Sequence, residues 1–143
     1  MKKRKKAKKK KVRAYIQGWG TYTNQTIVVV GMTHDQITGV MRRMKADPKI
    51  IAAWDKDKKE NDERWLAGAN NGCSWFHDGR SLVWFKDWKN NWEHWDTLVH
   101  ELSHVIDQVL AVEKGMATET EGKAYQFEYL FRQIRRKLFQ LYP

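Results

Sequence analysis

Runs of β-branched and aromatic residues punctuate this chain and predict four short strands. Two of them, 12–17 and 26–32, lie near the start and are joined by a turn-rich segment. Two more, 73–77 and 80–86, flank the dipeptide Asp78-Gly79. A two-residue turn of type I′ needs positive φ at both central residues, and Asp-Gly supplies it readily. The pattern therefore predicts that 73–77 and 80–86 form a hairpin.

Apolar residues at helical spacing predict four helices between and after these strands. The first covers about 34–45 and has Thr33 as its expected cap. The second covers 48–66 and begins with proline, which is favoured at the first helical position. The third covers 87–111, and the last covers 118–139, with a threonine at its first position as the expected cap. Strands and helices in this order predict an α+β fold, with a small mixed or antiparallel sheet packed on helices.

The third predicted helix contains an apolar stripe in which residues recur every three or four positions. Its members are Trp88, Trp92, Trp95, Val99, Leu102 and Ile106. At 100° per residue, His100, Glu101 and His104 fall outside this stripe. We expect the stripe to be core and the two histidines to face a cleft at its edge.

Positive charge is concentrated at one end of the chain. The net charge is +10, and residues 1–11 alone hold nine lysines and arginines. A block of like charge repels itself, so we expect a disordered basic tail over 1–11 and a folded domain over 12–143. Such a tail is either a solubilising segment or a non-specific contact for nucleic acid through residues 2–11. The basic residues Arg132, Arg135, Arg136 and Lys137 suit the C-terminal end of a helix and need no nucleic-acid partner.

The composition also limits the possible disulfides, the cellular compartment and any association with a membrane. Cys73 is the one cysteine of the chain, so no disulfide within the chain is possible, which suits a reducing cytoplasm. No apolar run approaches the roughly 18 residues of a membrane span, and no apolar segment of a secretory signal follows the basic start. We expect a cytoplasmic protein without a membrane partner.

The sequence His100-Glu101-Leu102-Ser103-His104 is the motif with the clearest chemistry. Two histidines four apart lie one turn apart on a helix, so both imidazoles can reach one tetrahedral Zn²⁺. Glu101 lies to the side of the pair, where a carboxylate can accept a proton from water activated by the metal. The motif therefore predicts a zinc site with His100 and His104 as ligands and Glu101 as general base.

A third protein ligand is needed, and several candidates are open. A longer motif with a third histidine fails, because position 107 is Asp and position 110 is Leu. We favour Glu121, with Tyr125 one turn later as a donor to a developing oxyanion. Glu119 is the alternative ligand, and Glu121 has a rival role in a capping box that starts at Thr118. Other residues considered, as weaker ligands or as partners of ligands, are His77, His94, Asp107, Glu113 and Glu128.

His100-Glu101-Leu102-Ser103-His104 followed by Glu121-x-x-Ala124-Tyr125 resembles the gluzincin branch of zincin-like metallopeptidases. It looks most like the small minimal domains with this motif that bacteriophage and prophage genomes encode, and the similarity covers about residues 80–131. The resemblance implies two histidines and a downstream glutamate on zinc, and a strand, Leu82 to Phe85, at the sheet edge beside the cleft. It also implies hydrolysis of a peptide bond in a peptide or protein substrate, in a host cytoplasm if the gene is viral.

Two rival functions remain open at this stage. One is a zinc-containing binding protein that does not hydrolyse, although only catalysis requires the carboxylate of Glu101. The other is a nucleic-acid-associated protein in which the basic tail is the main functional element. The tail is also compatible with a peptidase delivered to DNA. Protease families of the SprT-like type combine both properties, but they use a third histidine that this chain lacks after His104.

Overall fold

The computed structural model describes residues 13–20, 22–63, 71–116 and 118–143. The elements follow in the order β1 (Ala14–Trp19), β2 (Tyr22–Val30), α1 (His34–Arg43), α2 (Pro48–Lys56), α3 (Lys58–Asn61), β3 (Gly72–His77), β4 (Arg80–Phe85), α4 (Trp92–Ile106), η2 (Asp107–Glu113) and α5 (Thr120–Leu141). The segment η2 continues α4 with π-helical hydrogen bonding. The predicted basic tail lies outside the described residues.

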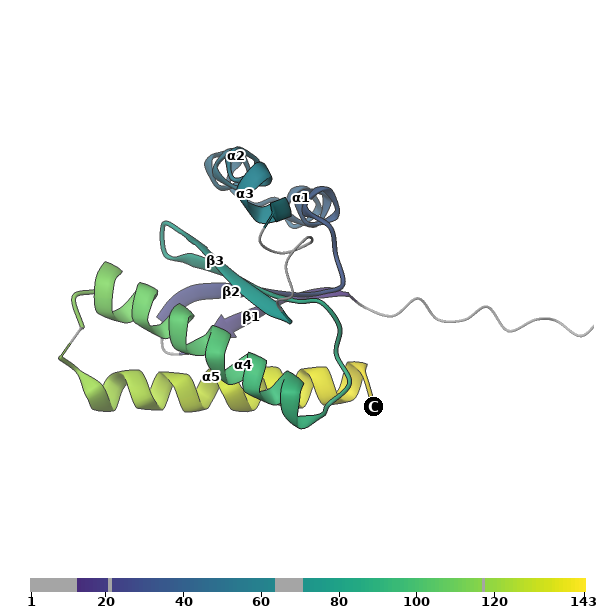
Figure 1. The fold of residues 1–143 in the computed structure, drawn as a ribbon. Coiled ribbons are helices and arrows are strands. Elements are labelled where there is room, and N and C mark those ends of the chain that lie inside the picture. The colour runs from purple at the N-terminus through teal and green to yellow at the C-terminus, as the bar shows by residue number, and fades with distance from the viewer. Residues whose placement is uncertain (1–12, 21, 64–70, 117) are drawn as a thin grey trace, which may run out of the picture.

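The four strands form one mixed sheet in the order β1-β2-β4-β3 (Figure 1). β1 pairs antiparallel with β2, and β3 pairs antiparallel with β4. The central pair, β2 and β4, is parallel, with Val28 opposite Val83. A parallel pair requires a crossover, which α1, α2, α3 and β3 supply. The expected α+β class with a small mixed sheet is confirmed.

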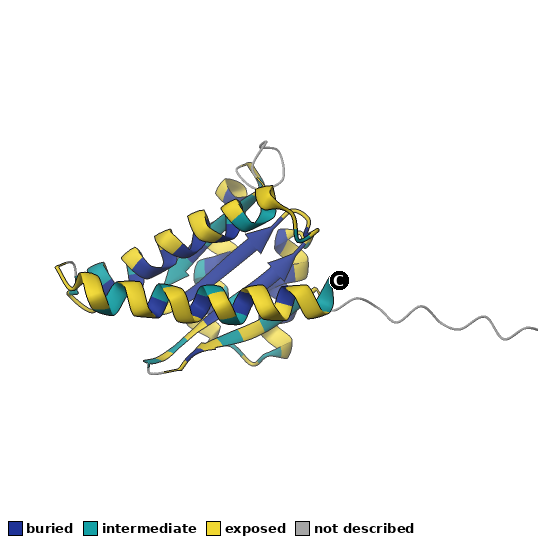
Figure 2. Ribbon diagram, turned by 90° about the horizontal axis from the view of Figure 1, so that it is seen from below, coloured by how far each residue is buried: buried dark blue, intermediate teal, exposed yellow. Residues whose placement is uncertain are grey.

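Helices cover both faces of the sheet, so the fold has three layers and two apolar cores (Figures 1 and 2). Successive side chains of a strand point to opposite faces of the sheet, so alternate residues of each strand enter different cores. On β4, Val83 and Phe85 pack toward α4 and α5, whereas Leu82 and Trp84 pack toward α1 and α2. β4 is buried on both faces, which explains its unbroken apolar run.

Local signals produced two of the clearest matches between sequence and structure. The hairpin between β3 and β4 is confirmed, and its turn has φ of 48° at Asp78 and 73° at Gly79. Thr33 caps α1 as expected: its hydroxyl accepts a hydrogen bond from the Gln36 backbone, and the Gln36 side chain accepts one from the Thr33 backbone. Both features depend only on neighbouring residues.

The predicted tryptophan stripe of the third helix is wrong in part. The helix begins at Trp92, so Trp88 lies in the preceding loop, where it is nevertheless buried. Trp92 is 77% exposed and Val99 is 40% exposed. The buried face of α4 instead consists of Leu98, Glu101, Leu102, Val105 and Ile106.

Three other boundaries differ from the predictions. Leu82 to Phe85 belongs to β4, an inner strand, and β3 occupies the sheet edge on that side. The cap of α5 is Glu119, whose carboxylate accepts from the backbone of Gly122, in place of Thr118. The predicted helix over 48–66 is interrupted at Asp57, between α2 and α3. In the described part of the chain, no helix is long and apolar enough to cross a membrane.

Candidate metal centre

Helix α4 carries the motif, and its position follows from its ends and its apolar face. The Asn91 side chain accepts a hydrogen bond from the backbone of His94 at 2.9 Å and so starts the helix. Leu98, Leu102 and Val105, all fully buried, fix its inner face against the sheet. The side chains of the motif are thus held on a helix whose rotation is set by the core.

His100 and His104 converge on one point at the surface of α4. Both are exposed, their ring planes are 80° apart, and their Nε2 atoms are 3.1 Å from one another. Two nitrogens bound to one tetrahedral Zn²⁺ at 2.0–2.1 Å lie about 3.3 Å apart. The pair therefore has nearly the separation of two zinc ligands, and a single N–H···N hydrogen bond would give the same distance.

Glu101 occupies a different environment from the histidines on either side of it. It is 6% exposed, and its stem lies beside Gly72 at the start of β3. No hydrogen bond or ion pair joins the Glu101 carboxylate to another described residue. Its stem is packed between α4 and β3, so the carboxylate is held in place next to the histidines.

Gly72 is a residue of this site that the sequence did not single out, since the strand was expected to begin at residue 73 and begins at Gly72. A Cβ at this position would lie 2.6 Å from Cγ2 of Thr97 and 2.8 Å from the Trp84 carbonyl oxygen. It would also lie 3.6 Å from Cγ of Glu101. Only glycine lets β3 approach α4 this closely. Its position at the start of a β-prone run was the available signal.

The structure does not bring the expected third ligand to the histidines. Glu121 is exposed in the first turn of α5, Glu119 is the cap of that helix, and Tyr125 is 69% exposed. Within the described residues, no three His, Cys, Asp or Glu side chains lie together in a way that could hold one ion. The roles of Glu121 and Tyr125 stay predictions.

The pairing of α4 with α5 explains why these residues are apart. The guanidinium of Arg135 stands 5.8 Å from the centre of the Trp95 ring, so Trp95 marks the side of α4 that faces α5. At 100° per residue, His100 and His104 lie about 140° and 180° around the helix from Trp95. The imidazoles therefore face away from α5, toward the side of α4 that β3 occupies.

Four of the other candidates have partners elsewhere. His77 stacks on Trp75, whose ring packs in the core on the side of α1 and α2. His94 accepts a hydrogen bond from the backbone of Lys89 at 2.6 Å. The two acidic residues considered as partners of ligands form ion pairs with basic residues of α5, since Asp107 lies 3.9 Å from Lys123 and Glu128 lies 2.6 Å from Arg132.

Comparisons with known proteins add no assignment. No protein-family model matches the chain, and neither a curated protein sequence nor a solved structure is significantly similar to it.

Proposed function

We propose that this protein is a zinc-dependent peptidase centred on His100, Glu101 and His104. The observation that carries the proposal is the separation of 3.1 Å between the two Nε2 atoms, beside a glutamate that is 6% exposed. The two imidazoles have nearly the separation of two zinc ligands, and the Glu101 carboxylate follows directly on the first of them. A cation held between the histidines would make use of both features.

Each residue has a separate part in the proposed reaction. His100 and His104 hold the ion through Nε2. Glu101, on the β3 side of the pair, accepts a proton from the attacking water and returns it to the leaving amine. Zinc supplies Lewis acidity toward a peptide carbonyl when it is bound. Gly72 keeps β3 close enough to α4 to hold the stem of Glu101.

The arrangement around the motif supports a zincin-like assignment with one change from the sequence-based expectation. β3 lies against α4 at the edge of the sheet, and its outer side is unpaired within the described part of the chain. An extended peptide can add to such an edge by main-chain hydrogen bonds. The strand proposed to receive the substrate is therefore β3, not Leu82 to Phe85.

A single substitution tests the proposed catalysis. Glu101→Gln keeps the size of the side chain but removes the base, so peptidase activity should fall by at least 100-fold on an unstructured protein such as casein. Zinc content, measured on the same preparation by mass spectrometry, should remain at that of the unchanged protein. Equal activity in both proteins with equal zinc would remove Glu101 from the mechanism.

The third ligand is tested separately. Glu121→Ala should weaken zinc binding by at least tenfold if Glu121 moves to the histidines when the ion binds. Glu119→Ala tests the alternative ligand on the same turn, and a loss of zinc affinity in this variant alone would assign the third position to Glu119. Unchanged zinc affinity in both variants would assign the remaining positions to water or to substrate.

A second function is favoured by the exposure of Glu121 and Tyr125 away from the histidine pair. A chain that keeps only two ligands would hold zinc at an interface, where a partner completes the site. In that case the protein would bind zinc weakly and show no hydrolysis, and Glu101→Gln would leave its binding properties unchanged.

A further inference from the structure

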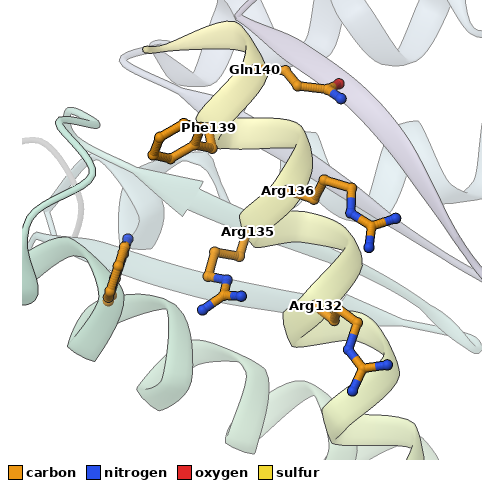
Figure 3. A pocket seen from close by; sticks show the side chains of 6 residues that line it. Arg132, Arg135, Arg136, Phe139 and Gln140 are labelled. Atoms are coloured by element: carbon orange, nitrogen blue, oxygen red, sulfur yellow. The ribbon is translucent and has the colours of Figure 1, made fainter.

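An open hollow of about 730 Å³ lies on the outer side of α5, against α4 (Figure 3). It is separate from the histidine pair, which lies on the opposite side of α4. Its lining comprises Trp95, Arg132, Arg135, Arg136, Phe139 and Gln140. A volume of this size is within the range of small-ligand sites.

The charge of this hollow is not explained by the helix that carries it. Between Arg132 and Leu141 the chain has four basic residues and no acidic one. The last turn of α5 contains no basic residue, whereas helix-dipole stabilisation fades within one turn. The sequence-based explanation of these arginines by the helix terminus is therefore wrong.

The arginines differ in how far their charge is compensated. Arg132 pairs with Glu128 at 2.6 Å, and both side chains are more than half exposed. Arg135 lies over the rings of Trp95 and Phe131 at 5.8 and 5.6 Å. Stacking holds a guanidinium in place and leaves its N–H groups available to an anion.

Aromatic rings accompany this charge at the surface. Phe139 is 58% exposed, and Trp92, whose ring centre is 5.4 Å from that of Trp95, is 77% exposed. Proteins that bind single-stranded nucleic acid combine exposed aromatic rings, which stack on bases, with guanidinium groups, which pair with phosphates.

We propose that this hollow, the arginine–aromatic groove of α4 and α5, binds single-stranded nucleic acid. Arg135 and Arg136 contact phosphates, and Phe139 stacks against a base. An acidic peptide would satisfy the arginines but would leave the exposed rings without a partner. The site is independent of the zinc proposal, so either can fail without the other.

The test uses the full-length chain and a fluorescein-labelled 12-mer of thymidine, with affinity measured by anisotropy from 50 to 200 mM salt. Arg135→Gln/Arg136→Gln should lower the slope of log K against log salt by about 1.4, because each phosphate contact on a single strand contributes about 0.7. Arg42→Gln/Arg43→Gln, which removes two exposed charges from α1, is the control of equal charge and should leave the affinity within twofold.

A second pair of measurements isolates base stacking. Phe139→Ala should weaken binding of the thymidine 12-mer about tenfold. The same substitution should not affect binding of an abasic 12-mer, which has the same phosphates without bases. Far-UV circular dichroism confirms that each variant is folded.

Three results would overturn the proposal. The first is an equal loss of slope in the α1 control, which would mean that any positive charge suffices. The second is an equal effect of Phe139→Ala on both oligonucleotides, or no effect on either. The third is tighter binding of poly-glutamate than of the thymidine 12-mer, which would assign the groove to acidic proteins.

Discussion

Tyr15 shows how one side chain can oppose the stability of a core that it helps to build. Its ring packs against the core beneath the sheet, yet its hydroxyl is sealed and has no partner within the described residues. Burial raises the pKa of Tyr15 above the ordinary 10.0, because the ionised form is poorly solvated there. The same residue thus contributes apolar area and an unmet hydrogen bond.

Tyr15→Phe should therefore raise the free energy of unfolding by about 1 kcal/mol, measured by urea titration at pH 7. The raised pKa adds a pH dependence. The folded protein holds the phenol proton more tightly than the unfolded chain, so stability is full below pH 10 and falls as pH rises beyond it. The substitution should reduce this alkaline loss. Tyr22→Phe is the control, because the Tyr22 hydroxyl has a partner in the sulfur of Met116 at 3.7 Å and should give no gain.

At the scale of single residues, sequence reasoning succeeded where the chemistry is local. The spacing of His100 and His104 within one helix requires their approach, and the Nε2 atoms do converge. The burial of Glu101 was not predicted. It depends on the rotation of α4 against β3, and the assumed tryptophan stripe set that rotation incorrectly.

Helix ends give a comparison between a cap that was predicted correctly and one that was not. The Thr33 side chain closes a capping box with Gln36, whereas Thr118 has no capping role in the structure. Thr33→Ala should lower the free energy of unfolding by about 1 kcal/mol, and Thr118→Ala should change it by less than about 0.5 kcal/mol. Both values come from chemical denaturation. Equal losses would mean that Thr118 caps α5 in solution.

The contact between β3 and α4 depends on the absence of a side chain at Gly72. Gly72→Ala should destabilise the fold by about 1–3 kcal/mol, because the methyl group would collide with the Trp84 carbonyl and with Thr97. The backbone carbonyl cannot move without distorting the sheet. Thermal denaturation measures the loss, and Gly18→Ala is the control, since nothing lies within 4 Å of its added Cβ. Equal stability of the two variants would show that β3 is not held this closely.

The sequence predicted which segments form helices and strands more accurately than it predicted where those elements begin and end. The turn at Asp78-Gly79 and the proline at the start of α2 act through their own backbone angles, so they could be recognised without the fold. The order of the sheet could not be recognised. The placement of β4 between β2 and β3 follows from the crossover through α1, α2 and α3, which no local pattern encodes.

The whole molecule separates two surfaces on either side of α4. The histidine pair lies on the side of α4 turned away from α5, and the arginine–aromatic groove is lined by α5 and by Trp95 of α4 (Figure 3). The offset between α4 and α5 decides which groups can meet. The ion pair between Asp107 and Lys123 reports this offset, and it leaves Glu121 beyond the end of the histidine motif. A short capping sequence cannot encode such a register, which explains why the third ligand was the least certain element of the site.

Zinc should stabilise the whole fold if the histidine pair binds it, because a ligand that binds only the folded state raises the free energy of unfolding. Thermal unfolding of the metal-free protein with 100 µM Zn²⁺ should give a higher Tm, and His104→Ala should abolish the shift. His77→Ala is the matched control, since His77 stacks on Trp75 away from the pair. The same measurement on Glu121→Ala reports whether the chain supplies a third ligand. If the zinc-induced rise in Tm is smaller in Glu121→Ala, α5 moves toward α4 when zinc binds. If the rise in Tm is unchanged, the chain holds zinc through His100 and His104 alone. An equal shift in His104→Ala would place the zinc elsewhere and remove the basis for a peptidase.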